Sequence, residues 1–131
     1  MDHDWIWITA DVARAIHGEQ LAQHGGPAGV RDQGGLESAM ARGPNLAAYG
    51  TPDAAELAAA YAFGIARNHP FVDGNKRSAA VVSETFLMLN GNRLDASDAE
   101  LVVAFQQLAA GELGEAELAA WFREHMKEPE R

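Results

Sequence analysis

The residues of this chain that could carry out chemistry are concentrated in one segment, residues 67–77, which reads RNHPFVDGNKR. The segment holds a histidine, one carboxylate, a glycine and three cations, a formal charge of +2 in a chain whose total is −9. Cations attract phosphate, and a glycine lets the backbone approach it closely and adopt a positive φ. The segment is therefore predicted to bind a phosphate group.

Two helical patterns flank this segment, over residues 52–68 and again after Asn75. Between them Pro70 cannot continue a helix, and it biases His69 away from the α region. Gly74 and the residues after it are expected to open the second helix, whose free N–H groups and positive dipole end form an anion site. The inward positions predicted for the two helices are Leu57, Tyr61, Gly64, Ile65, Ala79, Val82, Phe86 and Leu89.

The side chains of this segment suggest specific roles. His69 suits a general base, because its pKa lies near neutrality. Asp73 suits Mg²⁺, which prefers one or two carboxylates plus phosphate oxygens, although it could instead be the N-cap of the second helix. Lys76 and Arg77 are expected to contact phosphate oxygens, with plain surface charge as the alternative, and Asn75 is expected to shape the anion site. A base, a metal carboxylate and a phosphate cradle indicate phosphoryl or nucleotidyl transfer.

Other residues near the segment have simpler interpretations. Phe71 is expected to anchor the loop in the core, and Arg67 is equally consistent with a surface role and with a contact to the pocket. His17 and His125 lie inside predicted helices, where packing or surface roles are commoner than chemistry.

Residues 69–77, HPFVDGNKR, resemble the core motif of the Fic/Doc family, H-x-F-x-[D/N/E]-[A/G]-N-x-R. Lys76 followed by Arg77 resembles the motif of the Doc branch of this family. The AMP-transferring Fic branch usually has Gly there and a second Arg at the position of Ala80. Residues 29–32 and 35–39 also resemble the N-terminal part of the family, so the resemblance covers nearly the whole chain.

The resemblance implies an all-α Fic/Doc fold that uses ATP and Mg²⁺, with His69 as the catalytic base, Asp73 as the metal ligand and residues 74–77 at the phosphates. Fic members transfer AMP to a hydroxyl side chain. Doc-type members pass the γ-phosphoryl group to a threonine of elongation factor Tu and arrest translation. Lys76 and Ala80 favour the Doc-type toxin, with AMP transfer as the first alternative and an inactive helical binding module as the second. The resemblance also implies a cognate antitoxin as a partner.

Composition sets the remaining expectations. A length of 131 residues with 47% hydrophobic residues predicts one compact helical domain over residues 1–131. Without cysteines, the chain can form no disulfide and no Cys-ligated zinc site. No stretch approaches the ~20 apolar residues of a membrane span, and Trp5–Ile8 is too short for a signal peptide, so a cytoplasmic protein is expected. Nine acids against three bases give residues 94–131 a net charge of −6, which disfavours nucleic-acid binding by this part of the surface.

A bundle of about six helices is predicted, with one possible strand at Trp5–Ile8. The first helix, over about 10–24, has Thr9 as its N-cap and Val12, Ile16 and Leu21 as inward positions. The second helix is expected at about 35–42, the third from Thr51-Pro52 to residue 68, and the fourth at 75–90. The fifth is expected after a capping box at Ser97–Glu100, with inward residues Leu101, Val102, Phe105 and Leu108. The sixth is expected at 115–127, with Leu118, Trp121, Phe122 and His125 on one face. Residues 25–35, rich in glycine, are predicted to form a loop.

Overall fold

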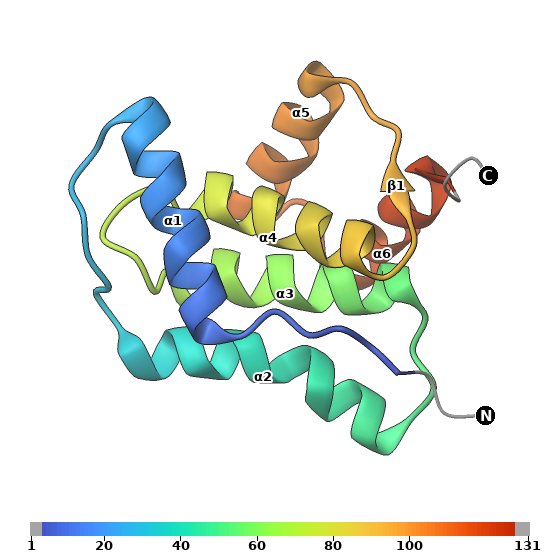
Figure 1. Ribbon diagram of the computed structural model, residues 1–131. Helices are drawn as coiled ribbons and strands as arrows, with labels where there is room; N and C mark the ends of the chain where they lie inside the picture. Colours follow the sequence, from blue (N-terminus) through green and yellow to red (C-terminus); the bar gives the residue numbers. More distant parts are fainter. Residues whose placement is uncertain (1–3, 128–131) are drawn as a thin grey trace.

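The computed structural model describes residues 4–127, and within them the chain forms six α-helices and one small two-stranded sheet (Figure 1). The all-α prediction is confirmed. The elements are α1 (Ala10–His24), α2 (Gln33–Tyr49), α3 (Ala54–Asn68), α4 (Asn75–Leu89), β1 (Arg93–Leu94), α5 (Asp98–Ala109), α6 (Glu115–His125) and β2 (Met126–Lys127). In the described part of the chain, no helix is both long enough and apolar enough to span a membrane.

Helix α3 lies at the centre of the bundle. It runs between α2 and α4 in Figure 1, and α6 also packs against it. Eleven of its fifteen residues are buried, as expected for a helix that neighbours cover on nearly all sides. Most of these residues are alanines, which let the neighbours come close. A Cβ atom on Gly64 would lie 3.0 Å from the Cα atom of Ala39, so α2 and α3 require a glycine where they cross.

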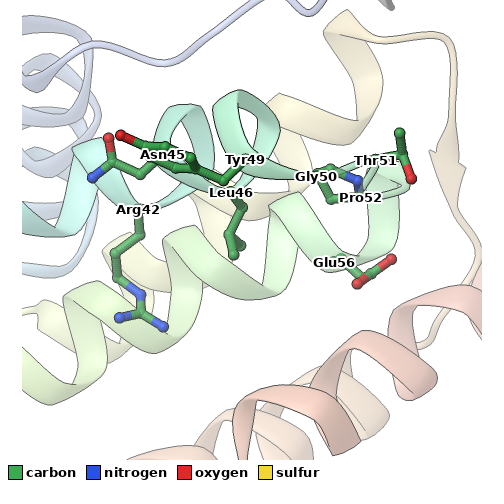
Figure 2. Close-up of a pocket in the computed structure, with 8 residues that line it drawn as sticks. All are labelled: Arg42, Asn45, Leu46, Tyr49, Gly50, Thr51, Pro52 and Glu56. Carbon is green, nitrogen blue, oxygen red and sulfur yellow. The ribbon is translucent and has the colours of Figure 1, made fainter.

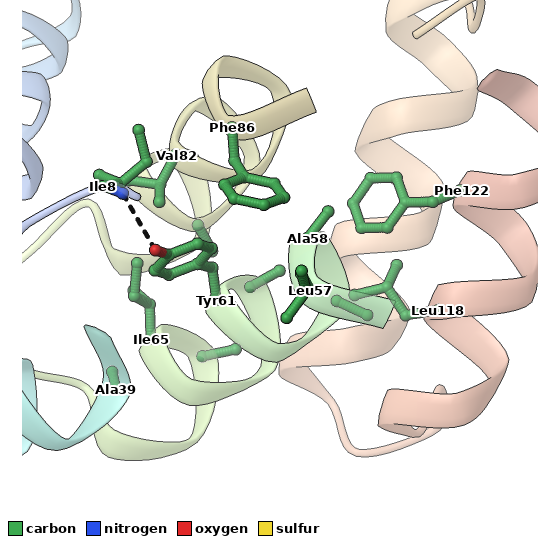
Figure 3. Close-up of a cluster of buried hydrophobic side chains, with 14 of the residues drawn as sticks. Ile8, Ala39, Leu57, Ala58, Tyr61, Ile65, Val82, Phe86, Leu118 and Phe122 are labelled. Atoms are coloured by element: carbon green, nitrogen blue, oxygen red, sulfur yellow. Dashed lines mark hydrogen bonds between the residues drawn. The ribbon is translucent and has the colours of Figure 1, made fainter. Parts of the chain in front are cut away.

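The N-terminal segment is anchored in the core through Tyr61 of α3. The hydroxyl of Tyr61 accepts a hydrogen bond from the backbone N–H of Ile8 at 3.0 Å (Figure 3). Burial raises the pKa of Tyr61 to about 12, so this hydroxyl keeps its proton at neutral pH. The rings of Trp5 and Trp7 each lie 5.9 Å from the ring of Phe86 on α4.

The segment Trp5–Ile8 is not a strand, so that prediction is wrong. Its run of large apolar residues reflects the packing of Trp5 and Trp7 onto α4 and the hydrogen bond of Ile8 to a side chain, with no β-ladder. The two strands that do form, β1 and β2, were not predicted. They pair antiparallel over two residues each, which is too short to give an alternating pattern, and the last helix accordingly ends at His125 and not at residue 127.

Several predicted helix ends are confirmed. The side chain of Thr9 accepts a hydrogen bond from Val12 N–H, α1 ends at Gly25, and Ser97 and Glu100 form the predicted capping box. The start of α3 is different, because its N-cap is Asp53 and not Thr51. A reciprocal capping box with the residue three positions later satisfies two N–H groups there, which a cap at Thr51 would not.

Helix α2 is longer than predicted, and it continues through Pro44 to residue 49. The tertiary packing of this part of the helix accounts for the difference. Gly43 is buried against Trp7, and a Cβ atom there would lie 3.3 Å from the tryptophan ring, so the backbone of α2 is held against the N-terminal segment directly before the proline. This packing offsets the hydrogen bond that Pro44 cannot donate.

The inward face of α1 is rotated by about one residue from the prediction. The buried residues are Ala13 and His17, whereas Val12 is 42% exposed. Leu89 and Val102 were also predicted to point inward and are exposed. The predicted inward positions that are buried are Leu57, Tyr61, Gly64, Ile65, Ala79, Val82, Phe86, Phe105, Leu108, Leu118 and Phe122.

Tyr61→Phe is expected to lower the free energy of unfolding by about 1–3 kcal/mol, because the buried N–H of Ile8 loses its acceptor. Urea denaturation measures the change. Tyr49→Phe is the matched control, since Tyr49 is 93% exposed and should change stability by less than about 0.5 kcal/mol. Equal effects for the two variants would contradict the anchoring role of Tyr61.

Candidate active site

The predicted site residues come together in one cleft where the chain passes from α3 to α4, at the left of Figure 1. We call residues 69–74, which connect these helices, the motif loop. The cleft has a volume of about 600 Å³, and its lining residues are His69, Val72, Asp73, Gly74, Asn75, Lys76, Arg77 and Ala109. The helix contacts of α3 and α4 thus bring every residue predicted from the motif to a single surface.

His69 caps the C-terminal end of α3 in a left-handed conformation, with φ 45° and ψ 55°. It is the one non-glycine residue with a positive φ between residues 4 and 127, and Pro70 after it disfavours the right-handed alternative. Its backbone N–H donates to Ile65, and its carbonyl accepts two hydrogen bonds from the guanidinium of Arg31, at 2.7 and 3.1 Å. His69 is exposed, and its imidazole forms no hydrogen bond within the described residues.

Residues 29–32 lie antiparallel to the motif loop and hold its backbone. The carbonyl of Pro70 accepts two backbone N–H groups of this segment, at 2.7 and 3.0 Å. The N–H of Val72 donates to the first carbonyl of the segment at 3.1 Å, and Val30 pairs with Phe71 in an isolated antiparallel bridge. The glycine-rich stretch therefore supports the backbone of the motif loop, besides connecting α1 to α2.

Two side chains fix the other half of the motif loop. Asn75 binds the backbone of Phe71 twice, accepting from its N–H and donating to its carbonyl, both at 2.9 Å. His17, which is buried, donates from Nε2 to the carbonyl of Asp73 at 2.7 Å, and its ring stacks on Phe71 with centroids 3.9 Å apart. Asn75, which was predicted to shape the site, thus holds the backbone of the motif loop at Phe71. The supporting role of His17 was not predicted, and the signal for it was its place one turn after Ala13 on the inward face of α1.

The first turn of α4 offers free N–H groups to the cleft. Its N-cap is Gly74, with φ 76°, and no side chain caps the helix. The alternative role of Asp73 as the N-cap is therefore wrong. Among the described residues, no acceptor meets the N–H groups of residues 75–77. Free N–H groups and the positive end of the helix dipole favour an anion at this position.

The charged side chains of the cleft are available to a ligand. Within residues 4–127, no ion pair or hydrogen bond engages the side chains of Asp73, Lys76 or Arg77. Asp73 lies against the glycine-rich loop, since a Cβ atom on Gly26 would be 2.6 Å from its carboxylate oxygen. The described residues contain no group of three or more potential metal ligands. A magnesium ion here would therefore need phosphate oxygens and water besides Asp73, which is the mixture of ligands that Mg²⁺ prefers.

Arg67 does not line this cleft. Its guanidinium lies 5.3 Å from the ring centroid of Phe63, and that of Arg42 lies 5.3 Å from the same ring. Of the two roles open to Arg67 from the sequence, the structure favours the surface one.

A second hollow, of about 640 Å³, lies at the far end of α3, between the last turns of α2 and the first turn of α3 (Figure 2). Its charged residues are already engaged. Arg42 forms an ion pair with Glu115, and Glu56 belongs to the capping box of α3. Because this hollow contains no motif residue and no histidine, we assign the chemistry to the slightly smaller cleft at the motif loop.

Comparison with known proteins shows the family of this chain. A family model described as the Fic/DOC family matches residues 7–87, and the chain belongs to this family. The chain is similar to Toxin Doc of Mycolicibacterium smegmatis, at 47% identity over 75 residues, covering 55% of this chain and 57% of that protein. It is also similar to Protein kinase doc of Escherichia phage P1, at 34% identity over 85 residues, covering 64% and 68%. The match therefore spans a little over half of the first relative and about two thirds of the second.

Titration with inorganic triphosphate is expected to shift the backbone amide resonances of residues 74–77 in nuclear magnetic resonance spectra, because the free N–H groups lie there. Arg77→Gln should weaken binding about 10- to 100-fold, the worth of one charge-assisted hydrogen bond. Arg93→Gln on β1 removes the same charge elsewhere and should leave the affinity within about twofold. Shifts confined to other segments would refute the anion site.

Proposed function

We propose that this chain is a Doc-type toxin that transfers the γ-phosphoryl group of ATP to a hydroxyl side chain of a translation factor. The observation that carries the proposal is that one cleft is lined by the exposed His69, by the uncapped start of α4 and by Lys76 and Arg77. The names of the two similar proteins, a Doc toxin and a Doc protein kinase, support the same function.

The transfer follows from the chemistry of these groups. The target hydroxyl loses its proton to the imidazole of His69 while its oxygen forms a bond to the γ-phosphorus. The bond between that phosphorus and the β,γ-bridging oxygen breaks, and ADP leaves. The N–H groups of α4 and the side chains of Lys76 and Arg77 stabilise the negative charge on the phosphate oxygens. Asp73 would hold Mg²⁺, which neutralises part of the same charge when bound.

Two residues favour phosphoryl transfer over AMP transfer. Lys76 brings a bulky cation to a position where the AMP-transferring branch usually has glycine. One turn after the start of α4, Ala80 leaves no cation where that branch has its second arginine. AMP transfer is the second candidate function, and it requires the α-phosphate to face His69.

The proposed target is a threonine of elongation factor Tu, and the proposed regulator is a cognate antitoxin that covers the cleft. The function as an inactive binding module is disfavoured, because the side chains of His69, Asp73, Lys76 and Arg77 are all competent for chemistry and none of them is used by an internal contact in the described part of the chain.

Incubation of the purified chain with elongation factor Tu and radiolabelled ATP is expected to place label from the γ-phosphate, and not from the α-phosphate, on the target. Mass spectrometry should then locate the added group on a threonine. Label from the α-phosphate would replace the kinase with AMP transfer. Absence of both labels would favour the binding module.

The control for this assay is His69→Ala, which should lower the transfer rate about 10²- to 10⁴-fold and abolish growth arrest at equal expression. Because His69 is exposed at a helix end, the variant should keep its helical circular dichroism spectrum. Growth arrest by the folded variant would contradict its role as the base.

Asp73→Asn keeps the size of the side chain next to Gly26 and removes the charge proposed to hold Mg²⁺. The rate at limiting Mg²⁺ is expected to fall by roughly tenfold or more, equivalent to about 1.4 kcal/mol, with partial recovery at high Mg²⁺. A magnesium titration of the transfer rate measures this. A wild-type titration curve for the variant would rule out Asp73 as the metal ligand.

A further inference from the structure

We propose that Arg31 is a positioning residue for His69 and that its guanidinium holds the proposed base in the conformation needed for catalysis. Arg31 lies outside the nine-residue motif, in the segment that precedes α2. It donates from Nε and Nη2 to the carbonyl oxygen of His69, at 3.1 and 2.7 Å. The inference rests on the proposed function, because it treats His69 as the base.

The conformation of His69 explains why such support is needed. A left-handed backbone is unfavourable for a non-glycine residue, and it persists only where the surroundings fix it. The neighbouring Pro70 donates no hydrogen bond and removes the right-handed alternative. The extended region stays open to His69, and a change to it would swing the imidazole to another direction. The two hydrogen bonds to the carbonyl oppose that change.

Arg31 acts on both sides of Pro70. Its side chain binds the carbonyl that precedes the proline, and its backbone N–H donates to the carbonyl of Pro70 itself at 2.7 Å. One residue therefore fixes the two consecutive carbonyl groups that set the direction in which His69 leaves the helix. Arg31 is not among the residues that line the cleft, and its hydrogen bonds are made to the motif loop.

Arginine suits this contact for a geometric reason. The planar guanidinium directs two N–H groups at one oxygen, whereas lysine supplies a single flexible ammonium and glutamine is neutral and shorter. Arg31→Lys therefore preserves the charge and one hydrogen bond, and Arg31→Gln removes the fork. Arg123→Gln is the matched control, because it removes the same charge from α6, where Arg123 pairs with Asp53.

The test compares these variants in the transfer assay. Arg31→Gln is expected to lower kcat about 10- to 100-fold while the KM for ATP stays within about threefold, since a small displacement of a catalytic group can cost about 10²-fold. The kcat of Arg31→Lys should lie between those of Arg31→Gln and the wild type, and the kcat of Arg123→Gln should equal that of the wild type. An unchanged kcat for Arg31→Gln would overturn the proposal. If the KM for ATP were raised at the same time, the result would indicate that Arg31 contacts ATP.

A second measurement separates this inference from the proposed function. The ¹³Cα and ¹³Cβ chemical shifts of His69 report its backbone conformation and require no activity. They should indicate the left-handed region in the wild type and lose that signature in Arg31→Gln. If the wild-type chain transfers no label, the proposed function fails, and the shifts still decide the role of Arg31. A left-handed His69 in folded Arg31→Gln would overturn it. If Arg31→Gln does not fold, Arg31→Lys is measured instead: its His69 shifts should move part of the way from the wild-type values, and shifts identical to those of the wild type would overturn the proposal.

Discussion

The inward direction of the motif-loop carbonyls is the constraint on which the rest of the site depends. The carbonyl groups of His69, Pro70, Phe71 and Asp73 all accept hydrogen bonds from the protein. The N–H groups of Phe71 and Val72 are engaged as well, so the free N–H groups at the cleft are those of residues 75–77, at the start of α4. A loop with its carbonyls facing outward would repel the phosphate that the nearby cations attract. The anion binding that we propose for this cleft therefore depends on the orientation of the backbone as well as on side-chain charge.

Two of the three side-chain donors to these carbonyls come from distant parts of the chain, and the third is close in sequence. His17 belongs to α1, Arg31 to the segment before α2, and Asn75 to α4 itself. The central helix α3 makes this convergence possible, since its small side chains let α2 and α4 pack closely on it. The overall acidity of the protein does not extend to the cleft, where the first turn of α4 concentrates two cations that no acid in the described residues neutralises.

Much of this arrangement could be predicted from the sequence. The break between α3 and α4 is encoded locally by Pro70 and Gly74, and the types of the motif residues indicate their chemistry. The roles of His17 and Arg31 could not be predicted, because they depend on contacts across 56 and 38 residues of sequence. The same limit applies to α2, which continues through Pro44 where Gly43 packs against the distant Trp7.

The attachment of the N-terminal segment to α4 has a consequence for biosynthesis. The backbone N–H of Ile6 donates to the side chain of Asn90 at 2.8 Å, a contact across 84 residues, and the nearby tryptophans pack on Phe86. A growing chain cannot make these contacts, or the hydrogen bond from α1 to the motif loop, until α4 has emerged from the ribosome. Domains dominated by such distant contacts fold late and as a unit. The cleft is therefore incomplete until α4 and Ala109 of α5, which also lines it, have been made, so the nascent polypeptide carries no assembled site before that point.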